Sequence, residues 1–127
     1  MRVLVPTAGL PPAMGTAEYI VRIASRLGAD IVVLHVYDGS HPAPDARAAF
    51  DVFVEAADKT GLGVQSRVQR GPVVETIIAV AEQGDFALIV MGASADVAVE
   101  DWVSSRVLHR SQLPVVVVPH LYRRKDG

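Results

Sequence analysis

The feature that most constrains the fold of this chain is a strict alternation of two apolar patterns. Short runs rich in β-branched residues, typical of buried strands, alternate with longer segments in which apolar residues recur at helical spacing. Such alternation predicts an α/β fold, in which a parallel sheet carries helices on both faces and the crossovers are right-handed. No internal repeat or linker interrupts the pattern.

The expected strands are apolar runs closed by proline, glycine or a polar residue. They cover Arg2–Pro6, Asp30–Asp38, Gly63–Gln69, Phe86–Gly92 and Leu113–Pro119. The third run alternates apolar and polar side chains, which favours a half-solvated strand near a sheet edge. A first helix is expected after a loop at 7–15, with Gly28 as its C-cap, and a second from an N-cap at Asp45 to about Gly61. A third helix is expected from Pro72 onward, and a fourth over Trp102–Arg110.

Length and composition limit the classes of protein to which this chain can belong. Its 127 residues, 50% of them hydrophobic, fit one domain, expected over residues 1–120 and followed by a polar tail at 121–127. The formal net charge of −2 argues against a nucleic-acid-binding surface. The absence of cysteine excludes disulfides, thiolate catalysis and cysteine metal sites. No apolar stretch reaches transmembrane length, so a cytoplasmic protein is expected.

Several chemistries that α/β folds host lack their motifs here. The chain has no P-loop string, and the first loop, PTAGLPPAMG, lacks the glycine spacing of a dinucleotide site. Ser94 lies in GASAD rather than in a nucleophile elbow, and no two histidines have metal-ligand spacing on one helix face. His35 is interpreted as a core or sheet-end histidine with a satisfied hydrogen bond. We therefore expect no catalytic residue, no metal site and no enzyme.

Ligands of doubly wound sheets bind beyond the carboxyl ends of the strands, where the strand order reverses. That rule directs attention to the loops after the first and fourth predicted strands. The first of these loops contains PTAG, and the second contains MGAS followed by three acidic residues before the next helix.

Two stretches of the chain carry a family pattern. The first is VLVPTAG…AEYIVRIASRLGADIVVLHVYD, over residues 3–38, and the second is FALIVMGAS…SRVLHRSQLPVVVVP, over residues 86–119. Together they resemble the universal stress protein family. The resemblance covers nearly the whole chain. It implies a three-layer fold of the adenine-nucleotide-hydrolase-like kind, with five parallel strands in the order 3-2-1-4-5 and helices on both faces.

ATP-binding members of that family carry a motif of Gly, two residues, Gly, nine residues, and then Gly-Ser or Gly-Thr. In this chain the first glycine corresponds to Gly92, the second to Ala95, and the final pair to Asp101 and Trp102. The loop between Ala95 and Asp101 is four residues shorter than in the family motif. The acid that the family carries in the first-strand turn corresponds to Ala8.

These departures predict that ATP does not bind in the family's usual way. Asp101 is expected to cap the following helix, and its carboxylate repels a triphosphate by several kcal/mol per close like-charge pair, an order-of-magnitude value. Trp102 adds bulk where a small residue leaves room. Two alternatives stay open: the loop could have changed neutrally, or Ser104 and Ser105 could replace the Gly-Ser pair if the helix starts a turn later.

The resemblance implies a stress-response module that acts through protein contacts as a homodimer and needs no cofactor. In the family order the apolar fifth strand lies at a sheet edge, where it pairs with the same strand of a second subunit. The alternative is a monomer whose tail folds over that edge. The predicted dimer interface is Val115, Val116, Val117 and Val118.

A second hypothesis is a module that still binds an adenine nucleotide, ATP or AMP with or without Mg²⁺, or a smaller anion. Val33 is then expected to form the floor of an adenine site, whereas Asp101 and Trp102 would block the phosphates. An enzyme of the related fold with weak nucleotide hydrolysis is a third hypothesis, which lacks an evident general base. The candidate nucleotide-binding residues are Pro6, Thr7, Ala8, Gly9, Val33, Met91, Gly92, Ser94, Ala95, Ser104 and Ser105.

Overall fold

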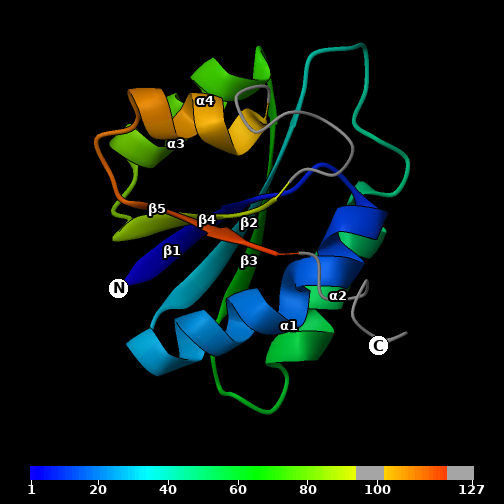
Figure 1. The fold of residues 1–127 in the computed structure, drawn as a ribbon. Coiled ribbons are helices and arrows are strands. Elements are labelled where there is room, and N and C mark those ends of the chain that lie inside the picture. The colour runs from blue at the N-terminus through cyan, green and yellow to red at the C-terminus, as the bar shows by residue number, and fades with distance from the viewer. Residues whose placement is uncertain (94–101, 120–127) are drawn as a thin grey trace.

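The computed structural model describes residues 1–93 and 102–119, which form one α/β domain. A central sheet lies between two layers of helices, with α1 and α2 on one face and α3 and α4 on the other (Figure 1). The strands are β1 Arg2–Pro6, β2 Asp30–Tyr37, β3 Val64–Arg70, β4 Leu88–Gly92 and β5 Val115–Val118. The helices are α1 Leu10–Leu27, α2 Ala46–Ala57, α3 Val73–Gln83 and α4 Val103–Arg110.

The topology of the sheet confirms the predicted fold class. The five strands are hydrogen-bonded in the order β3-β2-β1-β4-β5, and every pair is parallel. Because β1 lies at the centre, the chain leaves it toward β2 on one side and returns on the other side for β4. The loops after β1 and β4 therefore diverge, which creates the switch point of a doubly wound sheet.

Two separate apolar cores form because alternate residues of a strand face opposite sides of the sheet. On β1, Val3 and Val5 pack toward α1 and α2, whereas Leu4 packs toward α3 and α4. On β2, Val33 belongs to the first core and Leu34 to the second. This division decides which strand residues can reach a site on either face.

The start of α1 differs from the expectation. The segment 7–15 is predicted to be a loop, but α1 begins at Leu10 and includes Pro11 and Pro12 in its first turn. Prolines are tolerated there because the first N–H groups of a helix have no partner within the helix. The C-cap is Gly28, as predicted, in the left-handed conformation with φ 66°.

Smaller corrections concern the ends of other elements. Pro72 is the N-cap of α3 rather than its first helical residue, and β4 begins at Leu88 rather than at Phe86. The ring of Phe86 lies instead under the guanidinium of Arg2, whose Cζ is 4.6 Å from the ring centroid. Asp45 is the N-cap residue of α2, as expected, but its side chain makes no hydrogen bond to that helix.

Candidate ligand site

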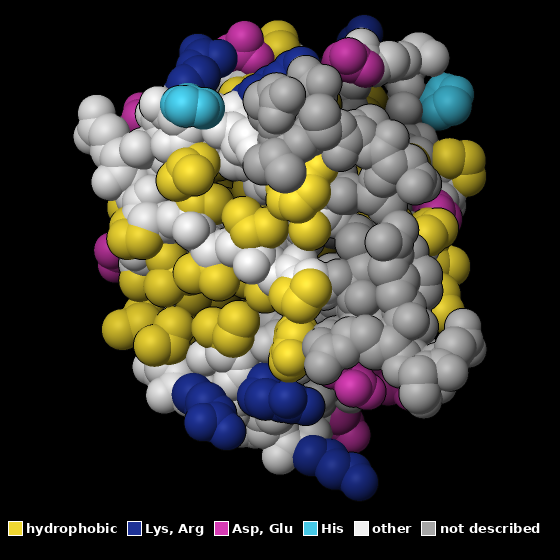
Figure 2. All heavy atoms as spheres, viewed as in Figure 1, with side chains coloured by type: hydrophobic (Ala, Val, Ile, Leu, Met, Phe, Trp, Pro, Cys, Tyr) yellow, Lys and Arg dark blue, Asp and Glu magenta, His cyan; other side chains and the backbone are white. Residues whose placement is uncertain are grey.

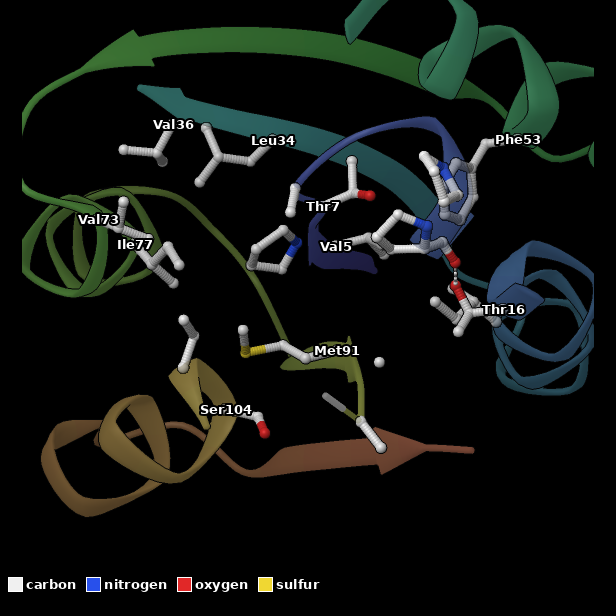
Figure 3. Close-up of a pocket in the computed structure, with 18 residues that line it drawn as sticks. Val5, Thr7, Thr16, Leu34, Val36, Phe53, Val73, Ile77, Met91 and Ser104 are labelled. Carbon is white, nitrogen blue, oxygen red and sulfur yellow. Dashed lines mark hydrogen bonds between the residues drawn. The ribbon is translucent and has the colours of Figure 1, made fainter. Parts of the chain in front are cut away.

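A cavity of about 510 Å³ opens at the switch point, beyond the carboxyl ends of β1, β2 and β4 (Figure 3). The turn after β1 forms one part of its wall, and the first turns of α1, α3 and α4 form others. Its described lining residues are Val5, Pro6, Thr7, Ala8, Pro11, Pro12, Thr16, Ile20, Leu34, Val36, Phe53, Val73, Ile77, Met91, Gly92, Ala93, Val103 and Ser104.

The wall of this cavity is apolar. Figure 3 shows Leu34, Val36, Val73, Ile77 and Met91 arranged around one side of the space, contributed by three different elements. Among the described residues that line the cavity, none carries a charged side chain. The volume falls within the roughly 300–1,000 Å³ typical of small-molecule sites in proteins.

Three lining residues carry polar side chains, and two of these are hydrogen-bonded locally. The Thr16 hydroxyl donates to the Pro12 carbonyl at 2.8 Å, and the Thr7 hydroxyl makes a longer contact of 3.5 Å with the Gly9 carbonyl. Ser104 is 1% exposed, and its Oγ has no hydrogen-bond partner among the described residues. The Oγ atom has less than 1 Å² of accessible surface, so this hydroxyl lies within the wall and not at the surface of the cavity.

His35 joins two of the loops beside the cavity. Its Nδ1 lies 3.4 Å from the Thr7 carbonyl oxygen, and its Nε2 lies 3.1 Å from the amide nitrogen of Ala43. Because an amide N–H can only donate, Nε2 accepts, and Nδ1 carries the proton that points to Thr7. His35 is 7% exposed, which confirms its interpretation as a sheet-end histidine with satisfied hydrogen bonds.

Asp45 makes a second connection between the turn after β1 and the segment that precedes α2. Its Oδ2 accepts a hydrogen bond of 3.1 Å from the Leu10 amide, the first N–H group of α1. The carboxylate also packs against Gly9, where an added Cβ would lie 3.0 Å from Oδ1. Asp45 thus caps a helix that lies far from it in the sequence, which no local pattern could reveal.

Six of the candidate nucleotide-binding residues line the cavity. They are Pro6, Thr7, Ala8, Met91, Gly92 and Ser104. Gly9 and Ser105 are not among the lining residues, and neither is Trp102, which is the N-cap of α4 in place of the expected Asp101. The helix therefore begins at Val103, one residue later than predicted. The remaining candidates, Ser94, Ala95 and Asp101, lie outside the described residues.

Val33 lies away from the cavity, in the core under α1 and α2. The two-residue period of a strand directs its neighbours Leu34 and Val36 toward the cavity instead. The sequence could have indicated this, because successive side chains of a strand face opposite sides of the sheet. Val33 and Leu34 therefore cannot both face the cavity. The sequence does not predict Pro11 and Pro12 as lining residues because residues 7–15 are expected to form a loop, and it does not predict Thr16 because the helical pattern is followed only from Ala17.

Comparison with known proteins identifies the family. The sequence model of the universal stress protein family matches residues 1–119. A search of the curated proteins found no match to the chain.

Solved structures with the same fold include several universal stress proteins. One in complex with cAMP has 19% identity and a TM-score of 0.76, covering 94% of this chain and 97% of that one. One from Archaeoglobus fulgidus in complex with dAMP has 17% identity and a TM-score of 0.71, and the match covers 92% of this chain and 96% of that one. UspA from Lactobacillus plantarum has 25% identity and a TM-score of 0.72, covering 93% and 97%.

The described residues contain neither a metal-binding cluster nor a membrane-spanning helix. No cluster of three or more histidine, aspartate or glutamate side chains in this part of the chain could hold a metal ion. Within the same residues, no helix has the length and apolar character needed to cross a membrane.

Proposed function

The chain belongs to the universal stress protein family, and on that basis we propose that it is a stress-response module that does not bind ATP in the family's usual way and acts as a homodimer. The observation that carries the first part is the uncharged wall of the switch-point cavity. The described lining residues provide neither lysine nor arginine for a phosphate chain.

Electrostatics explains why this wall disfavours a triphosphate. Moving several negative charges from water to an apolar surface is unfavourable unless cations or aligned N–H groups replace the lost hydration. The Ser104 hydroxyl is one neutral group and cannot replace that hydration for three phosphates. Ala8, at the turn after β1, provides no side-chain hydrogen bond to the rest of a nucleotide.

A smaller adenine nucleotide is the alternative function. The first turn of α4 contains Ser104, and helix N-termini favour a single anionic group. Two universal stress proteins of the same fold have been solved in complex with cAMP and dAMP, which carry one phosphate each. An AMP-class ligand, with or without Mg²⁺, would place its base against the apolar wall and its phosphate near α4.

Calorimetric titration tests the ligand part of the proposal. The purified protein is titrated with ATP and Mg²⁺, AMP, and adenosine, and whatever co-purifies is identified by mass spectrometry. We expect no saturable ATP binding below about millimolar concentration, a free energy of roughly 4 kcal/mol. Micromolar ATP binding by the unmodified protein would refute the proposal, whereas AMP binding alone would select the alternative.

The homodimer part rests on the β5 edge of the sheet. β5 pairs only with β4 among the described strands and consists of four valines, of which Val117 is 40% exposed. Figure 2 shows hydrophobic side chains gathered around this edge. An exposed apolar edge strand is prone to pair with another strand, and a second copy of β5 would give a symmetric two-fold contact through residues 115–118.

A further inference from the structure

We propose that the open edge of β3 binds an extended acidic segment of a partner protein, which joins the sheet as an added strand. This edge lies across the sheet from β5, and no residue of β3 is among the described residues that line the switch-point cavity. A partner at this edge would therefore bind independently of the proposed homodimer and of any ligand in the cavity.

The backbone of β3 has hydrogen-bonding groups that its one neighbouring strand does not use. Among the described strands, β3 pairs with β2 alone. Gly63, just before β3, accepts a hydrogen bond of 2.9 Å from the Ile31 amide. Gly71, just after β3, donates one of 2.8 Å to the Tyr37 carbonyl. Because successive residues of a strand direct their backbone groups to alternate sides, the odd-numbered residues face β2.

The even-numbered residues of β3 consequently present their N–H and C=O groups to the outside. They are Val64, Ser66, Val68 and Arg70. The last three of these are exposed, so the outer side of the strand is accessible. β3 has 7 residues and no proline, which leaves room for a continuous ladder with another strand. In strand addition such main-chain hydrogen bonds supply the affinity.

The charge of β3 favours an acidic partner. Arg67 and Arg70 give the strand two positive charges and no negative one, in a chain whose formal net charge is −2. The ion pairs of the described residues are Arg47 with Asp51 and Arg110 with Glu75, so neither arginine of β3 is in an ion pair there. A second copy of β3 would add two more positive charges to this edge, whereas carboxylates on a facing strand would neutralise those present.

The positions of the side chains specify the partner further. Val68 and Arg70 are two residues apart and share one face of the sheet, while Arg67 is on the opposite face. Val68 is apolar and 47% exposed, so a β-branched residue beside it would cover that surface. The segment that fits this edge therefore has one such residue with a carboxylate on either side of it in sequence.

A short peptide with this pattern tests the proposal. Thr-Glu-Thr-Val-Glu-Thr, amidated and with a neutral fluorophore at its N-terminus, can pair antiparallel to β3, the slightly more stable arrangement. Its valine then lies opposite Val68, and its two glutamates lie opposite Arg70 and Arg67. Fluorescence anisotropy should show saturable binding below about 1 mM. The same peptide with both glutamates replaced by lysine should bind at least about 10-fold more weakly.

N-methylated peptides separate strand pairing from simple attraction of charges. In the antiparallel register the N–H of the peptide valine faces β3, and the N–H of the threonine before it faces away. N-methylation of the valine removes a ladder donor and should weaken binding at least about 10-fold. N-methylation of that threonine is the matched control and should change binding by less than about 2-fold.

Variants of the protein locate the site. Arg67→Gln with Arg70→Gln should weaken binding of the acidic peptide about 3- to 10-fold. Arg22→Gln with Arg26→Gln removes the same charge from exposed positions on α1 and should leave binding within about 2-fold.

A proline in β3 tests the backbone directly. Ser66→Pro removes an N–H that faces away from β2, so the ladder with β2 keeps its hydrogen bonds while peptide binding should fall more than about 10-fold. Ser66→Ala is its control and should bind as the wild type does. If Ser66→Pro does not fold, the two N-methylated peptides make the same test on the unmodified protein.

Three results would overturn the inference. One is the absence of saturable binding of the acidic peptide, which would leave the arginines of β3 only the role of keeping other sheets away. Another is equal binding of the glutamate and lysine peptides, or equal loss in the two double variants. The third is an equal effect of the two N-methylations, which would exclude pairing as an added strand.

Discussion

At the scale of single residues, two side chains hold the turn after β1 in place. His35 bridges the Thr7 carbonyl and the Ala43 amide, and Asp45 binds the Leu10 amide. Both come from the β2 side of the molecule, so the mouth of the cavity is shaped by residues that do not line it. Their role is one of positioning, because neither is among the described lining residues.

Replacement of His35 should lower stability. In His35→Phe the ring keeps its bulk, but the Ala43 N–H loses its acceptor and the Thr7 carbonyl loses its donor. An unpaired buried polar group costs about 1–3 kcal/mol. Urea unfolding should therefore show a loss of that size, while His41→Phe at an exposed position should change stability by less than about 0.5 kcal/mol. An equal effect of the two variants would contradict the bridging role.

Removal of the Asp45 carboxylate should also destabilise the fold. Asp45→Ala leaves the Leu10 amide without its cap, a loss of about 0.5–2 kcal/mol for helix caps in general. Asp45→Asn retains an acceptor oxygen and should recover most of the stability. Asp51→Ala is the control on the same helix, because its ion pair with Arg47 is exposed and worth about 0–1 kcal/mol. Thermal unfolding of the three variants distinguishes these effects, and a loss in Asp51→Ala as large as in Asp45→Ala would argue against a specific cap.

At the scale of elements, the two edges of the sheet have different chemistry. β3 has the sequence VQSRVQR, so polar and basic side chains outnumber the two valines along that edge. β5 has the sequence VVVV and no charged residue. Charged side chains on an edge strand discourage pairing with another sheet, and their absence from β5 makes this edge the favoured dimer contact.

A lysine in β5 should disrupt the proposed homodimer. Val117→Lys places a charge at a position that is 40% exposed, so it should shift the sedimentation coefficient from dimer toward monomer with little effect on the fold. Val68→Lys, at 47% exposure on β3, is the matched control and should sediment as the wild type does. A wild-type protein that sediments as a monomer at tens of micromolar, well above a transient affinity of about 1 μM, would refute the dimer.

At the scale of the whole molecule, the sequence predicted the fold class and most element bounds because these depend on local periodicity, whereas the strand order was predicted from the family resemblance. What it could not predict depends on contacts between distant segments. The start of α1 at Leu10 is an example, since its capping carboxylate comes from Asp45. The cavity was placed at the right loops, but its Leu34 and Val36 wall follows from the face on which β2 packs.

Restoring ATP binding should require changes in several parts of the molecule at once. Asp101→Gly with Trp102→Ser removes charge and bulk yet should recover little, because the loop remains four residues shorter than in ATP-binding members. Insertion of a full-length glycine loop together with Ala8→Asp should recover more, since backbone amides and the acid of the first turn return together. Calorimetric titration with ATP and Mg²⁺ follows the series, and full recovery in the double variant would show that loop length is unimportant.

The bond between Asp45 and Leu10 also has a consequence for exchange with solvent. A first-turn amide of a helix ordinarily exchanges its hydrogen quickly, because it has no partner within the helix. The Leu10 amide has a partner on another segment of the chain, so its exchange should require that segment to move away. The deuterium uptake of this one amide thus reports how often the start of α2 separates from the start of α1, in a protein otherwise unmodified.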